Sequence, residues 1–204
     1  MQLIFGTHNQ NKVEEITKIL PSGYVIKSLT DLNFNTEIEE SGTTLKENAL
    51  IKATTIFNIF KKDCFADDSG LMVNALGGRP GVLSARYAGN KKIAKDNTNK
   101  LLSELKGVND RRALFKTVIA LILEGNKYLF EGVIKGEIST SPKGQYGFGY
   151  DPIFMPKDRP ETFGELEPSL KHAISHRADA FKKLKTSLFR SFVAGWLKYL
   201  QVGP

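Results

Sequence analysis

Hydrophobic residues in the first third of the chain follow two alternating spacings. Residues 2–6 form a short apolar run typical of a buried strand. The apolar residues that follow, from Val13 to Leu20, recur at helical spacing and stop at Pro21, which cannot continue a helix. The pattern then repeats and predicts a strand at 24–29, an amphipathic helix at 44–61 and a strand at 64–67. Alternating strands and helices indicate an α/β protein.

The second half of the chain predicts an antiparallel portion of the same sheet. Residues 112–123 and 128–138 are rich in β-branched and aromatic residues, and a hairpin-like turn separates them. Helices are expected at 93–105 and 175–200. Residues 69–87 contain four glycines and a proline, so we expect a loop there. Because no linker rich in proline or serine divides the chain, we expect one domain over residues 1–204.

Composition indicates a folded protein without disulfides or membrane segments. Of the 204 residues, 41% are hydrophobic and 25% are charged, which are ordinary globular values. The single cysteine, Cys64, lies in an apolar run and is expected to be a small buried hydrophobe. The chain begins without the features of a signal peptide, and no run approaches the roughly 20 apolar residues of a membrane helix. We therefore expect a cytoplasmic protein that does not bind membranes.

The charge balance favours small anionic ligands. There are 29 lysines and arginines against 22 acidic residues, a net charge of +7 that attracts anions such as nucleotides. The cations are spread along the chain, whereas a nucleic-acid binder more often shows a basic stripe with interleaved aromatic residues. We therefore expect no nucleic-acid partner.

Two adjacent acids are placed where the predicted strand at 64–67 ends. Asp67 and Asp68 are followed directly by Ser69. Carboxylates delivered together to the exit of a strand repel each other, so we expect a cation nearby. Mg²⁺ suits hard oxygen ligands and usually works with one or two carboxylates plus substrate phosphates. The sequence therefore indicates phosphate chemistry.

A second candidate feature is the turn at residues 7–12, between a strand and a helix. Free N–H groups and the helix dipole favour a bound phosphate at such a helix start. Thr7 and Asn9 could add hydrogen bonds and Lys12 a charge, although Thr and Asn are also common helix caps. An acidic turn before the helix at 44–61 offers Glu39 and Glu40, which could complete a metal site with Asp68.

A third feature is the glycine-rich loop at 144–152. Phe148, Tyr150 and Asp151 supply two aromatic faces and a carboxylate, which could stack a base and bind its edge or could pack into the core. His176 and Arg177 offer donors suited to keto oxygens or phosphates.

Five motifs in chain order resemble the inosine triphosphate pyrophosphatase family, also called Ham1-like or RdgB-like. They are Thr7-x-Asn9-x-x-Lys12, Ala66-Asp67-Asp68-Ser69-Gly70-Leu71, Gly77-Gly78-x-Pro80-Gly81-Val82-x-Ser84-Ala85-Arg86-Tyr87, Gly147-Phe148-Gly149-Tyr150-Asp151-Pro152 and Ile174-Ser175-His176-Arg177. The resemblance runs nearly end to end. It implies an elongated α/β fold, with a mixed sheet flanked by helices, two lobes around a central nucleotide-binding cleft, and a homodimer.

The resemblance also implies an activity and a set of site residues. Family members use Mg²⁺ to hydrolyse non-standard purine nucleoside triphosphates, ITP, dITP and XTP, to the monophosphate and pyrophosphate. Asp68 would bind the metal and act as the candidate base for water, and Lys12 would stabilise the leaving pyrophosphate. Glu40 would be the second metal carboxylate, with Glu39 as the alternative. The substrate contacts that the resemblance implies, besides Lys12, are Thr7, His8, Asn9, Gln10, Asn11, Lys52, Ser69, Phe148, Gly149, Tyr150, Asp151, Lys171, His176 and Arg177.

Two alternatives stay open on the sequence alone. A Maf-like nucleotide pyrophosphatase would act on standard pyrimidine or modified nucleotides, but Ser84-Ala85-Arg86-Tyr87 and Ser175-His176-Arg177 match the Ham1-like pattern better. A non-enzymatic binder of nucleotides or RNA would use the positive charge and the aromatic residues. Such a binder would not need Asp68 beside a phosphate-binding turn.

Overall fold

One mixed sheet runs through the molecule. The computed structural model describes residues 2–17 and 23–200, with side chains as far as residue 188. The strands are β1 (Gln2–Phe5), β2 (Val25–Ser28), β3 (Cys64–Val73), β4 (Arg112–Leu123), β5 (Asn126–Ile138) and β6 (Phe154–Pro156). Their order across the sheet is β2-β1-β3-β4-β5-β6. The pairs β2/β1 and β1/β3 are parallel, and the pairs from β3 to β6 are antiparallel. The expected mixed sheet with an antiparallel portion is confirmed.

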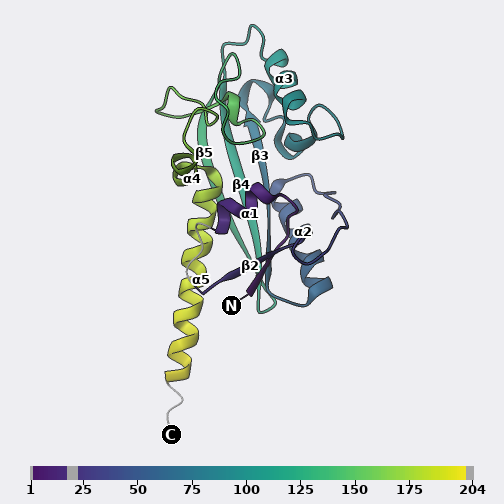
Figure 1. The fold of residues 1–204 in the computed structure, drawn as a ribbon, viewed down its shortest axis with the longest axis vertical. Helices are drawn as coiled ribbons and strands as arrows, with labels where there is room; N and C mark the ends of the chain where they lie inside the picture. The colour runs from purple at the N-terminus through teal and green to yellow at the C-terminus, as the bar shows by residue number, and fades with distance from the viewer. Residues whose placement is uncertain (1, 18–22, 201–204) are drawn as a thin grey trace.

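Helices flank this sheet and give the molecule an elongated shape (Figure 1). They are α1 (Gln10–Thr17), α2 (Leu45–Phe60), α3 (Ala94–Glu104), α4 (Pro168–Ile174) and α5 (His176–Leu200), with short 3-10 helices η1 (Asn74–Leu76), η2 (Gly81–Arg86) and η3 (Asp151–Ile153). The sequence predicted all of the α-helices except α4. The expected end of the first helix, at Ile19, Leu20 and Pro21, lies outside the described residues. Within the described ranges, none of the helices combines the length and hydropathy that a membrane crossing requires.

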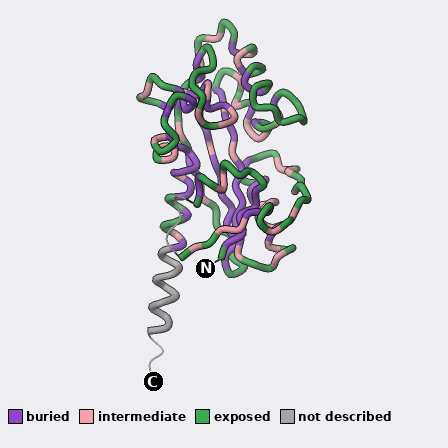
Figure 2. The backbone as a smooth tube through the Cα atoms, in the orientation of Figure 1, coloured by how far each residue is buried: buried purple, intermediate pink, exposed green. Residues whose placement is uncertain are grey.

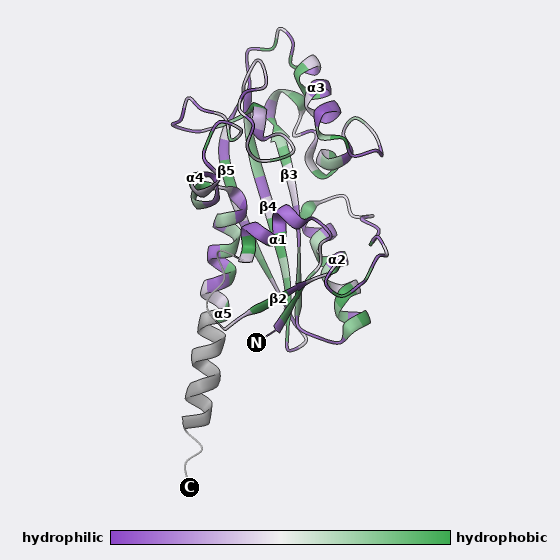
Figure 3. Cartoon of the chain, in the orientation of Figure 1, coloured by the Kyte–Doolittle hydropathy of each residue, from purple (hydrophilic) through white to green (hydrophobic). Residues whose placement is uncertain are grey.

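Strand alternation divides the core between the two faces of the sheet. Leu3, Phe5 and Phe65 pack with α1 and α5 on one face. Ile4 and Ala66, whose side chains point the other way, pack with α2 on the opposite face. Figure 2 shows that buried residues follow the central strands, and Figure 3 shows that hydrophobic residues concentrate on these strands and on α2.

A third hydrophobic cluster forms the second lobe. It lies where the C-terminal part of β3 and the N-terminal part of β4 pack with α3 and β6. Its buried members include Leu71, Leu101, Phe115 and Phe154. The long strands β3, β4 and β5 thus serve both lobes. The two lobes and their central cleft, expected from the resemblance, follow from strands that continue beyond α1 and α2.

The loop expected at 69–87 is partly wrong, because β3 continues to Val73 and pairs with β4 along its whole length. Gly70 lies within the strand, where a Cβ atom would lie only 2.4 Å from the carbonyl oxygen of Gly81. Gly70 therefore marks a close approach of two backbones and not the end of a strand. As a consequence, Asp67 and Asp68 lie in the middle of β3, and their expected position at its exit is also wrong.

The hairpin between β4 and β5 is tighter than the sequence indicated. Only Glu124 and Gly125 separate the strands, and both have positive φ, 50° and 76°. Two such residues form the turn whose twist matches that of the flanking strands.

Candidate active site

A cavity of about 640 Å³ opens between the two lobes. Among the residues expected to bind substrate or metal, those that line it are Thr7, His8, Asn9, Asn11, Lys12, Glu40, Lys52, Asp68, Ser69, Phe148, Gly149, Tyr150, Asp151, Lys171, His176 and Arg177. Gln10 and Glu39 are exposed and do not line it. The fold thus brings together residues from five separate parts of the chain.

The two adjacent acids point to opposite faces of β3, because successive side chains on a strand alternate. Asp67 shares the face of α1 and α5 with Ser69, and Asp68 faces α2. The repulsion that the sequence suggested is therefore reduced by the strand between them. Each carboxylate has cations of its own.

Asp67 is buried at 1% exposure and is held in its ionised form. Lys12 Nζ lies 2.9 Å from its carboxylate, and Ser69 Oγ donates to it at 3.1 Å. Arg177 Nε lies 3.8 Å from the same group. Burial opposes ionisation, but Lys12 and Arg177 outweigh it and hold the pKa of Asp67 well below its usual range. Asp67 thus fixes Lys12 at the wall of the cavity.

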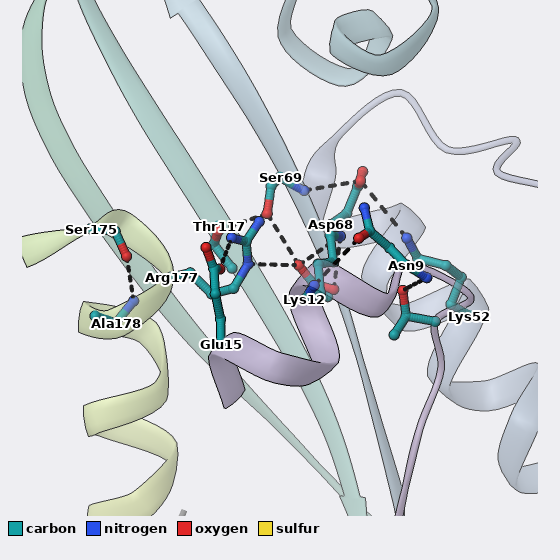
Figure 4. Close-up of polar contacts among 12 residues, drawn as sticks. Asn9, Lys12, Glu15, Lys52, Asp68, Ser69, Thr117, Ser175, Arg177 and Ala178 are labelled. Atoms are coloured by element: carbon teal, nitrogen blue, oxygen red, sulfur yellow. Dashed lines mark hydrogen bonds and ion pairs between the residues drawn. The ribbon is translucent and has the colours of Figure 1, made fainter. Parts of the chain in front are cut away.

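Asp68 and Glu40 share one cation on the other face. Lys52 Nζ donates to Glu40 and lies 3.8 Å from Asp68, while Asn48 Nδ2 donates to Asp68 at 3.2 Å. Burial, opposed by Lys52 and reinforced by Glu40, raises the pKa of Asp68. Two carboxylates around one ammonium form a place where a cation is favoured. Figure 4 shows Lys52 and Asp68 of this group.

The start of α2 positions this pair. Thr44 and Glu47 form the capping box, in which Thr44 Oγ1 accepts from the Glu47 N–H and Glu47 accepts from the Thr44 N–H, each at 3.1 Å. On the next turn Asn48, fully buried, accepts from the Gly42 N–H at 2.8 Å and donates to Asp68. Asn48 therefore ties the loop before α2 to β3.

Side chains of the turn before α1 mainly hold the turn itself. Thr7 Oγ1 accepts from the Asn9 N–H at 3.1 Å, and Asn9 Oδ1 accepts from the Lys12 N–H at 3.3 Å. These contacts are those of helix capping, as the alternative interpretation had it. The side chain of Lys12 instead binds Asp67 and lines the cavity.

The glycine-rich loop also lines the cavity. Phe148 is half-buried, with Lys171 Nζ at 4.6 Å and Arg177 Cζ at 5.5 Å from its ring centre. Asp151 accepts from the Phe148 N–H at 2.6 Å and from Lys171 at 2.7 Å. Tyr150 is buried and donates its hydroxyl to the Ser84 carbonyl at 2.8 Å. Phe148 thus lines the cavity with a half-buried ring, while Tyr150 and Asp151 secure the loop.

His176 is a neutral buried group at the cavity wall. Its ring stacks on Phe115 at 4.7 Å with an interplanar angle of 10°, and its Nδ1 is buried without a hydrogen-bond partner. Burial and the neighbouring cations Arg177 and Lys171 lower its pKa well below 6.5. A neutral imidazole can accept a hydrogen bond as well as donate one.

Sequence reasoning missed three residues of this site. Glu15 is buried against Lys171 and Arg177, Asn48 binds Asp68, and Arg86 lies 3.8 Å from Glu40 at the cavity wall. Glu15 follows Lys12 by three residues, so a shared helix face was readable. Its partners lie 156 and 162 residues away, and no local pattern indicates them.

Comparison with known proteins agrees with this geometry. The model of the Ham1 family matches residues 3–187. A dITP/XTP pyrophosphatase of Christiangramia forsetii is 52% identical over 184 residues, 90% of this chain and 97% of that protein. The dITP/XTP pyrophosphatase of Bacillus subtilis is 49% identical over 191 residues, 92% of this chain and 96% of that protein. The Ham1 protein of Staphylococcus aureus superposes with a TM-score of 0.86 at 37% identity, covering 94% of this chain and 100% of that chain. This chain belongs to the Ham1 family.

Proposed function

We propose that this chain is a Mg²⁺-dependent pyrophosphatase that hydrolyses non-standard purine nucleoside triphosphates, dITP and XTP among them, to the monophosphate and pyrophosphate. The observation that carries the proposal is one cavity lined by two separate clusters of side chains. Glu40, Lys52 and Asp68 form one cluster, here called the phosphate end, and Phe148 with Lys171 and Arg177 forms the other, here called the base end. The relatives named dITP/XTP pyrophosphatase support the same activity.

The base end suits a purine with a 6-keto group. Phe148 offers a stacking face, and Lys171 and Arg177 bring donors beside it. A keto oxygen accepts hydrogen bonds from these donors, whereas the amino group of adenine would face them with its own N–H groups. Adenine nucleotides would therefore be rejected, because buried donors would be left without acceptors.

The phosphate end suits a triphosphate and a divalent cation. Asp68 and Glu40 fit Mg²⁺, because both carboxylates already share the single ammonium of Lys52 and Mg²⁺ is bound by one or two carboxylates plus phosphates. In the described part of the chain, no group of three or more His, Cys, Asp or Glu side chains is placed to hold a metal ion. Substrate phosphates would therefore supply the remaining ligands. When bound, the ion would neutralise phosphate charge.

The chain's own groups account for the hydrolytic step. Asp68 accepts a proton from water as the water oxygen bonds to the α-phosphorus. The bond from the α-phosphorus to the oxygen that bridges it to the β-phosphorus breaks, and pyrophosphate leaves with the electron pair. Lys12, held at the cavity wall by Asp67, stabilises the charge on the leaving group. No covalent enzyme intermediate is needed, and Cys64 is unsuited as a nucleophile because burial raises its pKa to about 12.

The test is Asp68→Asn, assayed for pyrophosphate release from dITP with Mg²⁺. Because the amide cannot take the proton, we expect turnover to fall about 100- to 10,000-fold while the fold is kept. Asp158→Asn is the matched control, since Asp158 is exposed and has a positive φ of 66° that asparagine tolerates. Full activity of the Asp68→Asn protein would refute the proposed role. The homodimer stays a prediction, which light scattering on the purified protein tests.

A further inference from the structure

Glu15 is a buried acid that the mechanism above does not use. It projects from α1 and is 5% exposed. Arg177 Nη1 donates to its carboxylate, Lys171 Nζ lies 3.3 Å from it, and His172 Nε2 lies 3.6 Å from it. Figure 4 shows Arg177 reaching from the start of α5 to Glu15 on α1. The buried Glu15 carboxylate therefore links α1 to α4, which carries Lys171, and to α5, which carries Arg177.

Lys171 and Arg177 need a shared counter-charge. Both side chains are 4% exposed, and both cations lie over the ring of Phe148. Two like charges held side by side away from water repel each other strongly. Among the ion pairs of residues 2–17 and 23–188, Glu15 is the acid common to both cations. The negative charge of Glu15 therefore reduces the repulsion between Lys171 and Arg177.

The other acids near these cations do not replace Glu15. Asp151 binds Lys171 at 2.7 Å but does not pair with Arg177. Asp67 lies 3.8 Å from Arg177 Nε, which is buried without a hydrogen-bond partner, and Asp67 is already bound to Lys12 at 2.9 Å. Thus Glu15, and not Asp67, sets the position of the guanidinium.

Electrostatics agree with a permanently charged Glu15. Burial raises the pKa of Glu15, but Arg177 and Lys171 outweigh burial and bring it below its usual value. The carboxylate therefore stays ionised beside its cations.

We propose that Glu15 is a positioning residue for substrate selection, which holds Lys171 and Arg177 over Phe148 so that their donors meet a keto purine. This inference rests on the proposed function. It assigns Glu15 no contact with substrate. Its effect reaches the base through the two cations, so loss of its charge should weaken binding of dITP more than that of dATP.

The test compares Glu15→Gln with the matched control Glu14→Gln, an exposed neighbour on the same helix. Pyrophosphate release from dITP and dATP is measured with Mg²⁺ over a range of substrate concentrations. For Glu15→Gln we expect the ratio of kcat/KM for dITP over dATP to fall roughly 10- to 100-fold, mainly through KM for dITP. That range corresponds to losing one charge-assisted hydrogen bond. Glu14→Gln should leave the ratio unchanged.

Glu15→Asp provides a graded comparison. It keeps the charge but withdraws the carboxylate, so we expect an intermediate ratio, about three- to tenfold below the wild type. Thermal unfolding identifies which variants are folded. A merely structural role would lower kcat for both substrates alike, through loss of active protein, and would leave KM and the ratio unchanged.

An unchanged ratio in folded Glu15→Gln, or in Glu15→Asp if only that variant folds, would overturn the proposal. Failure of the proposed function gives a different result, because the wild type would then release no pyrophosphate from dITP. In that case calorimetry with dIMP decides the role of Glu15. Weaker binding by Glu15→Gln than by Glu14→Gln would support it, and equal binding would overturn it.

Discussion

At the residue scale, His176 shows how buried charges determine a protonation state. It is buried and stacks on Phe115, and the nearby cations Arg177 and Lys171 add to burial in lowering its pKa. Since its pKa in the folded protein is well below 6.5, the unfolded chain binds a proton more readily than the folded one near pH 6. The folded state therefore loses stability as the pH falls below 6.5.

We expect the ring signals of His176 to show no titration between pH 8 and about pH 6 in NMR spectra, because the imidazole remains neutral. His176→Phe keeps a flat ring against Phe115 and removes the titrating group. The wild type should therefore lose stability relative to His176→Phe as the pH falls below 6.5. Protonation of His176 near pH 6.5 would contradict this account.

Residue identities at the site were predictable where motifs carry them, and less so where distant contacts define them. Lys12, Asp68 and Phe148 belong to short motifs, and all line the cavity. The role of Asp67 was misjudged, because adjacency along the chain suggested a repelling pair while strand alternation separates the two acids. Glu15 could not be assigned, since its partners belong to elements far away in sequence.

At the scale of elements, Arg111 joins the end of α3 to the end of β5. Its guanidinium donates to the carbonyls of Ile138 at 2.6 Å, Leu105 at 3.1 Å and Ser139 at 2.7 Å. Neighbouring Arg112 forms an ion pair with Asp110, and its side chain is 69% exposed. Removal of Arg111 should therefore lower the stability of the fold more than removal of Arg112.

We expect Arg111→Met to lower the free energy of unfolding by about 3 kcal/mol, because three backbone carbonyls lose a charged donor. Arg112→Met should change it far less, as is usual for an exposed ion pair. Urea titrations of the two variants measure both values. Equal effects would show that the three carbonyls find other donors.

Elements with a strong period were predictable, while boundaries set by close packing were not. The helix at 44–61 has a cap and an apolar stripe, and α2 occupies Leu45–Phe60. The length of β3 was missed because Gly70 marks where the Gly81 backbone approaches the strand, a fact of tertiary structure. The short helix α4 has no apolar period long enough to indicate it.

At the scale of the whole molecule, the two lobes share strands. β3 contributes Phe65 to one core cluster and Leu71 to another, and β4 contributes Ile119 and Phe115 to the same two clusters. Loss of either core should therefore disturb strands that belong to both lobes. The single domain over 1–204 stays a prediction, which cooperative unfolding of the two lobes would test.

We predict a single unfolding transition in urea for both lobes. Circular dichroism reports loss of secondary structure, and hydrogen exchange of α2 and α3 amides reports the two lobes separately. The midpoints should coincide. Separate midpoints for α2 and α3 would show that the lobes are independent domains.

The most direct test of the central claim is product analysis with dITP, XTP, ATP, GTP and dTTP, with Mg²⁺ and with a chelator. We predict one pyrophosphate per monophosphate from dITP and XTP, at rates at least about 100-fold above those for the other nucleotides and abolished by the chelator. Comparable release from ATP or dTTP, or no release from dITP and XTP, would contradict the account.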